Sequence, residues 1–367
     1  GYAALDLWDM SLDLSGGNNT IHHISNGIVS NRCDLYVTDC FIHDIQPDAA
    51  YEHYANGSAI YANGRKAFKY LKQIGYGQTG APSFQDCHWG IYTEYMNVHS
   101  VDNNMVNVGT AYRVDRSGYM EIDILNNRVH TKYHGMDLRF NDGAAHVLVE
   151  NNDITFGEDQ VCTLCRGYSA ILVSEGNTAN PNSVIRSNVI HFVPLPSSRF
   201  GVNLNSANDW LVQGNVIEMA SRFHSRTGIA TNGCDRAQVS CNEVTNTDMF
   251  YAQYPQDGQA GVRNWMGQDP LIGCNTVDKT TNGILFSGGA SNTDLRGNEF
   301  HNHRWGLHLE NAVIGGQAHR GNVWFEAAPL NGSQAICEPA GNAIDNPFVV
   351  DPAITPPGGS PLPATIS

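Results

Sequence analysis

The sequence is poor in charged side chains, in long apolar runs and in helical patterning. Charged residues make up 16% of the 367-residue chain, against about 25% in an average globular protein. No apolar run approaches the roughly 18 to 20 residues that a membrane-spanning helix needs, so we expect no membrane span. Helical patterning is nearly absent, which makes helical and leucine-rich repeats poor descriptions of the chain.

A start methionine and a basic leader are also missing from the first residues, GYAALDLWDM, so we interpret the chain as a processed or excised fragment. Positive charge is scarce, and the net charge of -15 predicts no nucleic-acid partner. A polyanionic substrate is disfavoured as well, unless local arginines or a bound cation make the electrostatic potential positive at the binding site. Nine cysteines suit an oxidising compartment, so we expect a secreted or cell-surface protein in which not all nine can pair.

Glycine and asparagine are abundant, at 37 residues each, and they recur at a fixed offset. In LRGNEFHNHRWGLHL, residues 295–309, Asn298 is followed eight positions later by Gly306, as Asn127 is by Gly135. We call the recurring asparagines the mark asparagines; they are Asn127, Asn152, Asn188, Asn215, Asn242, Asn275, Asn298 and Asn322. A second mark, a small residue before an apolar one, stands at Gly135, Ala170, Gly201, Gly228, Gly261, Gly283 and Gly306. Paired marks that return every 23 to 36 residues indicate an internal repeat.

The segments that flank the marks resemble short strands, because β-branched and polar residues roughly alternate in HVLVENNDITF and NDWLVQGNVIEM. Such a unit cannot bury its apolar face alone and must stack on copies of itself. We therefore predict an all-β fold, a right-handed single-stranded parallel β-helix (a solenoid) with loop insertions along one edge. Each mark asparagine is expected to adopt the left-handed corner conformation and to bond its counterparts as a ladder. Each mark glycine is expected to permit close backbone approach.

With this pattern the chain resembles the right-handed parallel β-helix proteins of the pectate-lyase-like superfamily over roughly residues 19–325. The resemblance implies the fold, and it leaves the activity open among polysaccharide lyases, hydrolases, epimerases, phage tailspikes and non-catalytic adhesins. We predict a parallel β-helix over residues 1–325. Residues 326–367, which end in NPFVVDPAITPPGGSPLPATIS, are expected to form a C-terminal cap and a Pro/Gly-rich tail.

Four consecutive turns carry extra residues at one corner, in the strings FGEDQVCTLCRGYS, HFVPLPSSRF, MASRFHSRT and NTDMFYAQYPQDGQA. Aromatic rings beside arginine and histidine suit a sugar chain, through stacking and charge-assisted hydrogen bonds. The predicted substrate-binding residues are Tyr133, Arg166, Tyr168, Arg199, Asn203, His224, Arg226, Arg263 and Tyr254. The alternative is a satellite core beneath long loops. Residues 61–88 are interpreted as a second long excursion, which folds over one end of the coil or packs beside the inserted loops.

Lys132, His134, Asp137 and Arg139 are the predicted catalytic residues. A uronate lyase needs a base for the proton beside the carboxylate and a cation that neutralises this carboxylate. Lys132, His134 and Arg139 could supply both, with calcium as the alternative cation; no cofactor is certain and no metal ligand is assigned. A solvated polar face would contain the same residue types.

A hydrolase needs two carboxylates about 5 to 9 Å apart, and on the outward row Asp137 stands alone. Asp142, Glu158 and Asp159 lie near it in the sequence. Neither the paired-aspartate motif of the polygalacturonases nor the DPH motif of the alginate epimerases occurs in the chain.

The cysteines allow several arrangements. Cys162 and Cys165 suit a loop disulfide better than half a zinc site or a redox pair. Cys241 and Cys274 each precede a mark asparagine, so stacking brings them within disulfide range, and a buried thiol ladder is the alternative. Cys40 occupies the position of a mark asparagine.

Two functions from different classes follow from these observations. The first is a secreted protein that binds and cleaves extracellular polysaccharide, as a lyase or a glycoside hydrolase. The second is a non-catalytic surface adhesin or structural β-helix that self-associates or adjoins further domains of a longer chain.

Overall fold

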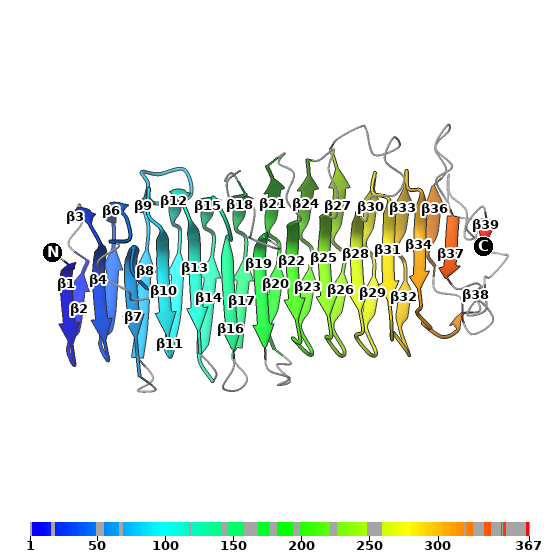
Figure 1. Ribbon diagram of the computed structural model, residues 1–367, viewed down its shortest axis with the longest axis horizontal. Helices are drawn as coiled ribbons and strands as arrows, with labels where there is room; N and C mark the ends of the chain where they lie inside the picture. The colour runs from blue at the N-terminus through cyan, green and yellow to red at the C-terminus, as the bar shows by residue number, and fades with distance from the viewer. Residues whose placement is uncertain are drawn as a thin grey trace. The chain divides into compact units, whose positions relative to one another are not determined.

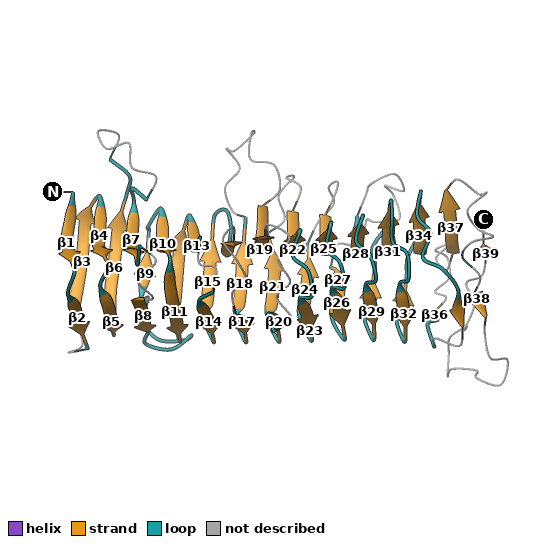
Figure 2. Ribbon diagram, turned by 90° about the horizontal axis from the view of Figure 1, so that it is seen from below, coloured by secondary structure: helices purple, strands orange, loops and turns teal. Residues whose placement is uncertain are grey.

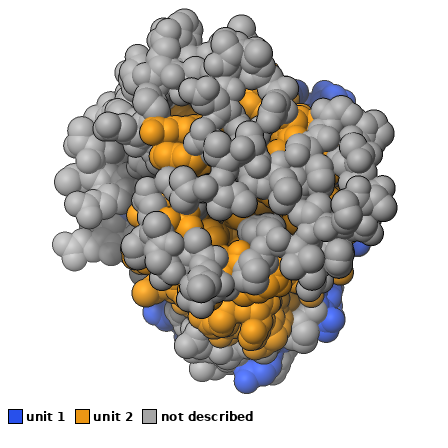
Figure 3. All heavy atoms as spheres, turned by 90° about the vertical axis from the view of Figure 1, so that its right-hand side faces the viewer, with its two compact units in different colours: residues 1–162, 169–189 blue, residues 163–168, 190–367 orange. Residues whose placement is uncertain are grey.

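The computed structural model describes most of the chain. The described residues are 2–15, 19–48, 55–65, 69–116, 119–140, 146–157, 168–175, 182–193, 199–220, 226–247, 259–318, 321–325, 334–338, 346, 348–349 and 365–366. All the helices and strands assigned in these ranges are β-strands, and none is a helix. The chain divides into two compact units, residues 1–162 with 169–189 and residues 163–168 with 190–367, which Figure 3 colours separately.

In the first unit each turn of chain supplies one strand to each of three parallel sheets (Figure 1). The first sheet runs β1 (Ala3–Trp8), β4 (Asn26–Asn31), β7 (Ser58–Asn63), β10 (Trp89–Glu94), β13 (Thr110–Asp115), β16 (Met136–Phe140) and β19 (Tyr168–Glu175). The second runs β2 (Ser11–Leu14), β5 (Asp34–Thr38), β8 (Lys69–Ile74), β11 (Met96–Val101), β14 (Glu121–Leu125), β17 (His146–Glu150) and β20 (Val184–Arg186). The third runs β3 (Asn19–Ile24), β6 (Cys40–Ile45), β9 (Phe84–Gln85), β12 (Asn104–Val108), β15 (Arg128–Thr131) and β18 (Asp153–Phe156).

The second unit repeats this plan (Figure 2). Its first sheet runs β22 (Arg199–Asn205), β25 (Arg226–Asn232), β28 (Ala260–Trp265), β31 (Asn282–Ser287), β34 (Trp305–Glu310), β37 (Gln334–Glu338) and β39 (Thr365–Ile366). Its second runs β23 (Leu211–Gln213), β26 (Gln238–Ser240), β29 (Leu271–Gly273) and β32 (Asp294–Arg296). Its third runs β21 (Val189–Phe192), β24 (Val216–Met219), β27 (Glu243–Asn246), β30 (Thr276–Asp278), β33 (Glu299–His301) and β36 (Val323–Phe325).

Successive strands of each sheet therefore come from successive turns, and the predicted right-handed parallel β-helix is confirmed. Parallel strands joined by a crossover adopt the right hand because of strand twist. The inner faces of the sheets pack the core, and alternate residues of each strand point inward. Val239, Ile272 and Leu295, for example, pair in register across three turns and are buried.

The predicted asparagine ladder is confirmed. In the first unit the Asn127 amide nitrogen donates to Asn152 Oδ1 over 2.9 Å, and Asn152 donates to Asn188 Oδ1 over 2.9 Å. In the second unit each mark donates to the next over 2.9 to 3.0 Å, in the order Asn215, Asn242, Asn275, Asn298 and Asn322. Asn103 extends the ladder by one turn, since it donates to Asn127 Oδ1 over 2.8 Å, and our sequence reading missed it. Buried amides thus satisfy one another along the stack.

The expectation that these asparagines take the left-handed conformation was wrong by one position. The left-handed residue is the one before each mark, such as Asn126 at φ 55°, Cys241 at φ 53° and Gly214 at φ 63°. The residue before the mark turns the corner in solvent, whereas the mark itself points inward for the ladder.

The mark glycines have the predicted role of permitting close approach. A Cβ added to Gly261 would lie 2.8 Å from the carbonyl oxygen of Gly283 and 2.1 Å from Val277 Cγ1. Gly261 is not among the residues with a positive φ, so lack of space rather than backbone conformation demands glycine here.

One sequence interpretation needs correction. Residues 61–88 are not an excursion, because they include the end of β7, all of β8 and β9, and therefore belong to a regular turn. Strand pairing continues beyond residue 325, since β37 pairs with β34, β39 pairs with β37, and β38 (Phe348–Val349) pairs with β35 (Gln317–Ala318). The cap and the Pro/Gly-rich tail expected for residues 326–367 stay a prediction.

None of the described cysteines forms a disulfide. Five of them are buried: Cys33, Cys40, Cys87, Cys234 and Cys337. Cys40 pairs in register with Asn19, as expected for a residue in the mark position. Cys241 and Cys274 are exposed, so a buried thiol ladder is ruled out, whereas Cys162 and Cys165 lie outside the described residues.

Candidate functional site

Asp137 and Arg139, two of the predicted catalytic residues, lie on β16 and form a network with Arg113 of β13. Asp137 is 2% exposed. Arg139 donates from Nε to Asp137 Oδ1 over 2.9 Å and from Nη2 to Oδ2 over 3.0 Å. Arg113 Nη1 also bonds Asp137 Oδ2, and its Nη2 donates to Asp115 Oδ2 over 3.1 Å.

This network engages both oxygens of the Asp137 carboxylate with guanidinium groups. A carboxylate that accepts three guanidinium N–H bonds and is almost completely buried offers little access to a substrate proton. Removing one partner of a buried ion pair leaves the other charge uncompensated, which is strongly destabilising. The geometry therefore favours a structural role for Asp137, in which it joins neighbouring turns of the first sheet.

His134, Lys132 and Tyr133 precede β16 at the same corner. The backbone N–H of Ser169 donates to His134 Nδ1 over 3.2 Å, so the neutral ring carries its proton on Nε2. Burial lowers the pKa of His134 below its usual range. Lys132 lies near His88, whose pKa is lowered first by burial and then by this lysine. The one nitrogen of the neutral ring that can accept a proton is thus occupied by the Ser169 N–H, and a catalytic role for His134 stays a prediction.

Arg226, predicted to bind substrate, is fully buried. Its Nη1 donates to the carbonyl of Ala220 over 2.8 Å, and its guanidinium lies 5.5 Å from the centroid of the Phe192 ring. Tyr168 is 3% exposed. A guanidinium that bonds backbone carbonyls inside the protein stabilises the corner, and these two placements match the satellite-core alternative better than ligand contact.

Asn203 and Arg263 lie on the first sheet of the second unit, where Asn203 is buried and Arg263 is half-buried. Asn232 donates to Asn203 Oδ1 over 2.8 Å and to Asn205 Oδ1 over 2.9 Å. The Arg263 guanidinium lies 5.9 Å from the ring of Trp265, and this tryptophan is 47% exposed. Amides, a guanidinium and an exposed ring therefore share this face.

Four further residues were predicted to bind substrate: Arg166, Arg199, His224 and Tyr254. Arg166, His224 and Tyr254 lie outside the described residues, together with most of the inserted strings. Arg199 begins β22 and its backbone pairs with Arg226, but its side chain is not described.

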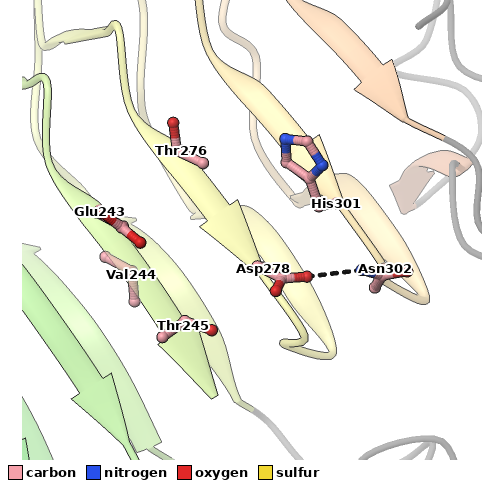
Figure 4. A pocket seen from close by; sticks show the side chains of 7 residues that line it. All are labelled: Glu243, Val244, Thr245, Thr276, Asp278, His301 and Asn302. Carbon is pink, nitrogen blue, oxygen red and sulfur yellow. Dashed lines mark hydrogen bonds between the residues drawn. The ribbon is translucent and has the colours of Figure 1, made fainter. Parts of the chain in front are cut away.

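A polar groove with a volume of about 250 Å³ lies on the outer face of the third sheet in the second unit (Figure 4). It is lined by Glu243, Val244, Thr245, Thr276, Asp278, His301 and Asn302. In register, Glu243 stands beside Thr276, and Thr245 beside Asp278, which stands beside His301. The intervening residues Val244, Val277 and Phe300 are buried. The alternation of inward and outward side chains therefore places polar groups from three successive turns on the same outer face of the sheet.

Hydrogen bonds and ring stacking order this groove. Asn302 donates from Nδ2 to Asp278 Oδ1 over 2.8 Å, as the dashed line in Figure 4 marks. The His301 ring stacks on Phe325 of the next turn, with centroids 4.2 Å apart and an interplanar angle of 7°. His301 Nε2 also lies 3.5 Å from Glu299 Oε2, and Lys279 Nζ lies 3.5 Å from Asp278 Oδ2.

Sequence analysis missed this groove, although a signal was available. Three successive mark asparagines, Asn242, Asn275 and Asn298, are each followed by a polar residue, a buried apolar residue and a second polar residue, in NEVT, NTVD and NEFH. Reading these triplets in register would have placed Glu243, Asp278 and His301 together.

No group of three or more His, Cys, Asp or Glu side chains among the described residues is arranged to hold a metal ion. Calcium as a cofactor stays a prediction. No helix in the described ranges has the length and apolar character needed to cross a membrane.

No family model, curated protein or solved structure matches the chain. The fold is therefore identified from strand pairing and the asparagine ladder, and membership of the pectate-lyase-like superfamily stays a prediction from the sequence.

Proposed function

We propose that this chain is a secreted β-helix protein that binds an extracellular polysaccharide in the groove between Glu243 and Asn302. The observation that carries the proposal is the combination of hydrogen-bonding groups and a stacked ring pair on one sheet face. Sugar hydroxyls need several acceptors and donors at fixed spacing, and sugar rings stack on flat aromatic surfaces.

The residues that line the groove match these needs. Glu243 and Asp278 offer carboxylate oxygens that accept hydrogen bonds from hydroxyls, and charge-assisted bonds of this kind are the stronger ones. Thr245 and Thr276 offer hydroxyls that donate and accept. Phe325 extends the surface as a ring beside His301.

The charges favour a neutral or amino sugar. Glu243, Asp278 and Glu299 are carboxylates at or beside the groove, whereas Lys279 is the nearby cation, and His301 is charged only when protonated. A uronate chain would place further carboxylates against these groups, and like charges repel. This groove therefore supports a uronate lyase less well than it supports recognition of uncharged sugars.

A glycan array followed by titration calorimetry tests the proposal. Wild-type protein should bind neutral or amino-sugar oligosaccharides more tightly than uronate oligosaccharides of equal length. Asp278→Asn and Phe325→Leu should each weaken binding by about tenfold, because each removes one contact of about 1.4 kcal/mol. Glu121→Gln, an exposed change on β14, is the matched control and should leave affinity unchanged. Equal affinity for wild type and both groove variants would exclude this groove as the site.

Glycoside hydrolysis is the second candidate, favoured by two carboxylates in one groove. Glu243 and Asp278 come from adjacent strands at diagonal positions and line the same groove, and a hydrolase needs two such carboxylates. New reducing ends, lost in both Glu243→Gln and Asp278→Asn, would support hydrolysis.

Release of unsaturated ends from uronate chains, read by near-ultraviolet absorbance, would instead support the lyase prediction at Lys132, His134 and Arg139. Binding without any cleavage would support a non-catalytic adhesin. Light scattering on the same samples reports self-association.

A further inference from the structure

Cys241 and Cys274 occupy the same corner of two successive turns in the second unit. Ser240 pairs in register with Gly273, directly before the two cysteines. Directly after them, the backbone N–H of Asn242 donates to Asn275 Oδ1 over 3.0 Å. Because the pairing holds on both sides, the two cysteines must be neighbours across the turns.

The spacing and backbone of this corner suit a covalent link. Neighbouring strands lie about 4.8 Å apart, and disulfides join residues whose Cα atoms are about 4.4 to 6.8 Å apart. Both cysteines have the left-handed conformation, at φ 53° and φ 58°, so their side chains leave the corner in the same direction.

The surroundings leave both sulfur atoms open to reagents. Both side chains are exposed. The corner positions of the adjoining turns are Gly214 and Gly297, which carry no side chain over the thiols. A hydrogen bond with Cys274, together with burial, raises the pKa of Cys241 to about 11, and this agrees with two thiols in contact.

The choice of residue is a separate observation. The same corner is occupied by Asn126, Asn151, Ser187 and, in the second unit, by glycines. Glycine and asparagine adopt the left-handed conformation at little cost, whereas other residues are strained by about 1 to 2 kcal/mol. Cys241 and Cys274 are the two successive corners in this column that both carry a thiol.

We propose that Cys241 and Cys274 are a modification site, at which reaction with a small-molecule disulfide joins the two turns through a reversible disulfide. One thiolate attacks the small disulfide, forms a mixed disulfide and releases one small thiol. The second cysteine then attacks the mixed disulfide, forms the Cys241–Cys274 bond and releases the second small thiol. Two protein thiols are oxidised, and one small disulfide is reduced to two thiols.

The bond closes a loop that contains β27, β28 and β29. Closing a loop of this length restricts the unfolded chain and so stabilises the folded one. We expect the oxidised protein to unfold several degrees above the reduced protein.

Tryptic mapping tests the proposal directly. Trypsin separates the two residues into peptides 237–263 and 264–279, each of which contains a single cysteine. After native protein is incubated with oxidised glutathione and alkylated, mass spectrometry should find these peptides joined and lighter by two hydrogen atoms than their sum. Reduction should release both.

Cys274→Gly is the matched variant, because Gly297 already occupies the adjoining corner. It should lose both the joined peptide and the thermal shift. Separate glutathione adducts on the two peptides, or a link from either peptide to Cys234, would overturn the proposal.

Discussion

Adjacent residues at each corner of this coil face opposite environments. Cys241 is exposed and left-handed, whereas Asn242, the next residue, is buried and bonded within the ladder. Polar groups of the exposed corner residue can bond water. The buried asparagine next to it cannot, and its amide is instead hydrogen-bonded by the neighbouring turns. Single residues therefore have to be interpreted by their place in the turn.

His303 is the buried group whose titration should be measurable. The backbone N–H of His301 donates to its Nε2 over 3.1 Å, and the ring is almost fully buried. Burial lowers the pKa of His303 to about 4, so the unfolded chain, with the ordinary value of 6.5, binds the proton more readily.

Stability should therefore be complete above about pH 6.5 and should fall as the pH drops from there towards 4, by about 3 kcal/mol at most. Urea unfolding across this range measures the loss. His303→Gln should show a shallower fall, whereas His99→Gln, a change of an exposed histidine, should match wild type. Parallel curves for wild type and His303→Gln would contradict the assignment.

Elements in this protein are short strands that depend on their neighbours. β26 has three residues and pairs with β23 on one side and with β29 on the other. Isolated strands of this length are not stable, so the side-chain ladder and the inward apolar residues must hold the turns in register.

Asn242→Ala should destabilise the protein by about 3 kcal/mol. The change removes the acceptor for the backbone N–H of Asn215 at 2.9 Å, and the donor to the carbonyl of Val212 at 3.0 Å. Buried groups left without partners cost about 1 to 3 kcal/mol each. Denaturant unfolding measures the loss. Gln213→Ala, a change of an exposed amide on β23, is the control and should stay within about 0.5 kcal/mol of wild type.

At the scale of the whole chain, each of the two units is a repeat structure in which successive turns pair along three sheets. Stability in such proteins approximates a sum of turn terms and nearest-neighbour terms. A local defect should therefore spread over few turns.

Hydrogen exchange on Asn242→Ala tests this expectation. Exchange should accelerate most in β23, β26 and β29, whereas protection in β11 of the first unit should stay as in wild type. Uniform acceleration in both units would indicate one cooperative structure instead.

The coil and its strands were predictable because they repeat local rules. The spacing of Asn and Gly corresponds to one turn of backbone, and the alternation of apolar residues identifies the inward positions, such as Val239, Ile272 and Leu295. The sequence pattern did not predict that Cys241, and not Asn242, takes the left-handed conformation. A pattern of residue types does not determine φ at one position.

Tertiary structure decided everything that joins different turns. Asp278 and His301 are 23 residues apart in the chain and meet in one groove, since the length of each intervening turn sets the register. Arg226 looked like a ligand contact in the sequence and became a buried structural group, because the protein surrounds it with carbonyl oxygens. The sequence by itself determined the repeating backbone, whereas long-range packing determined which side chains are buried and which reach solvent together.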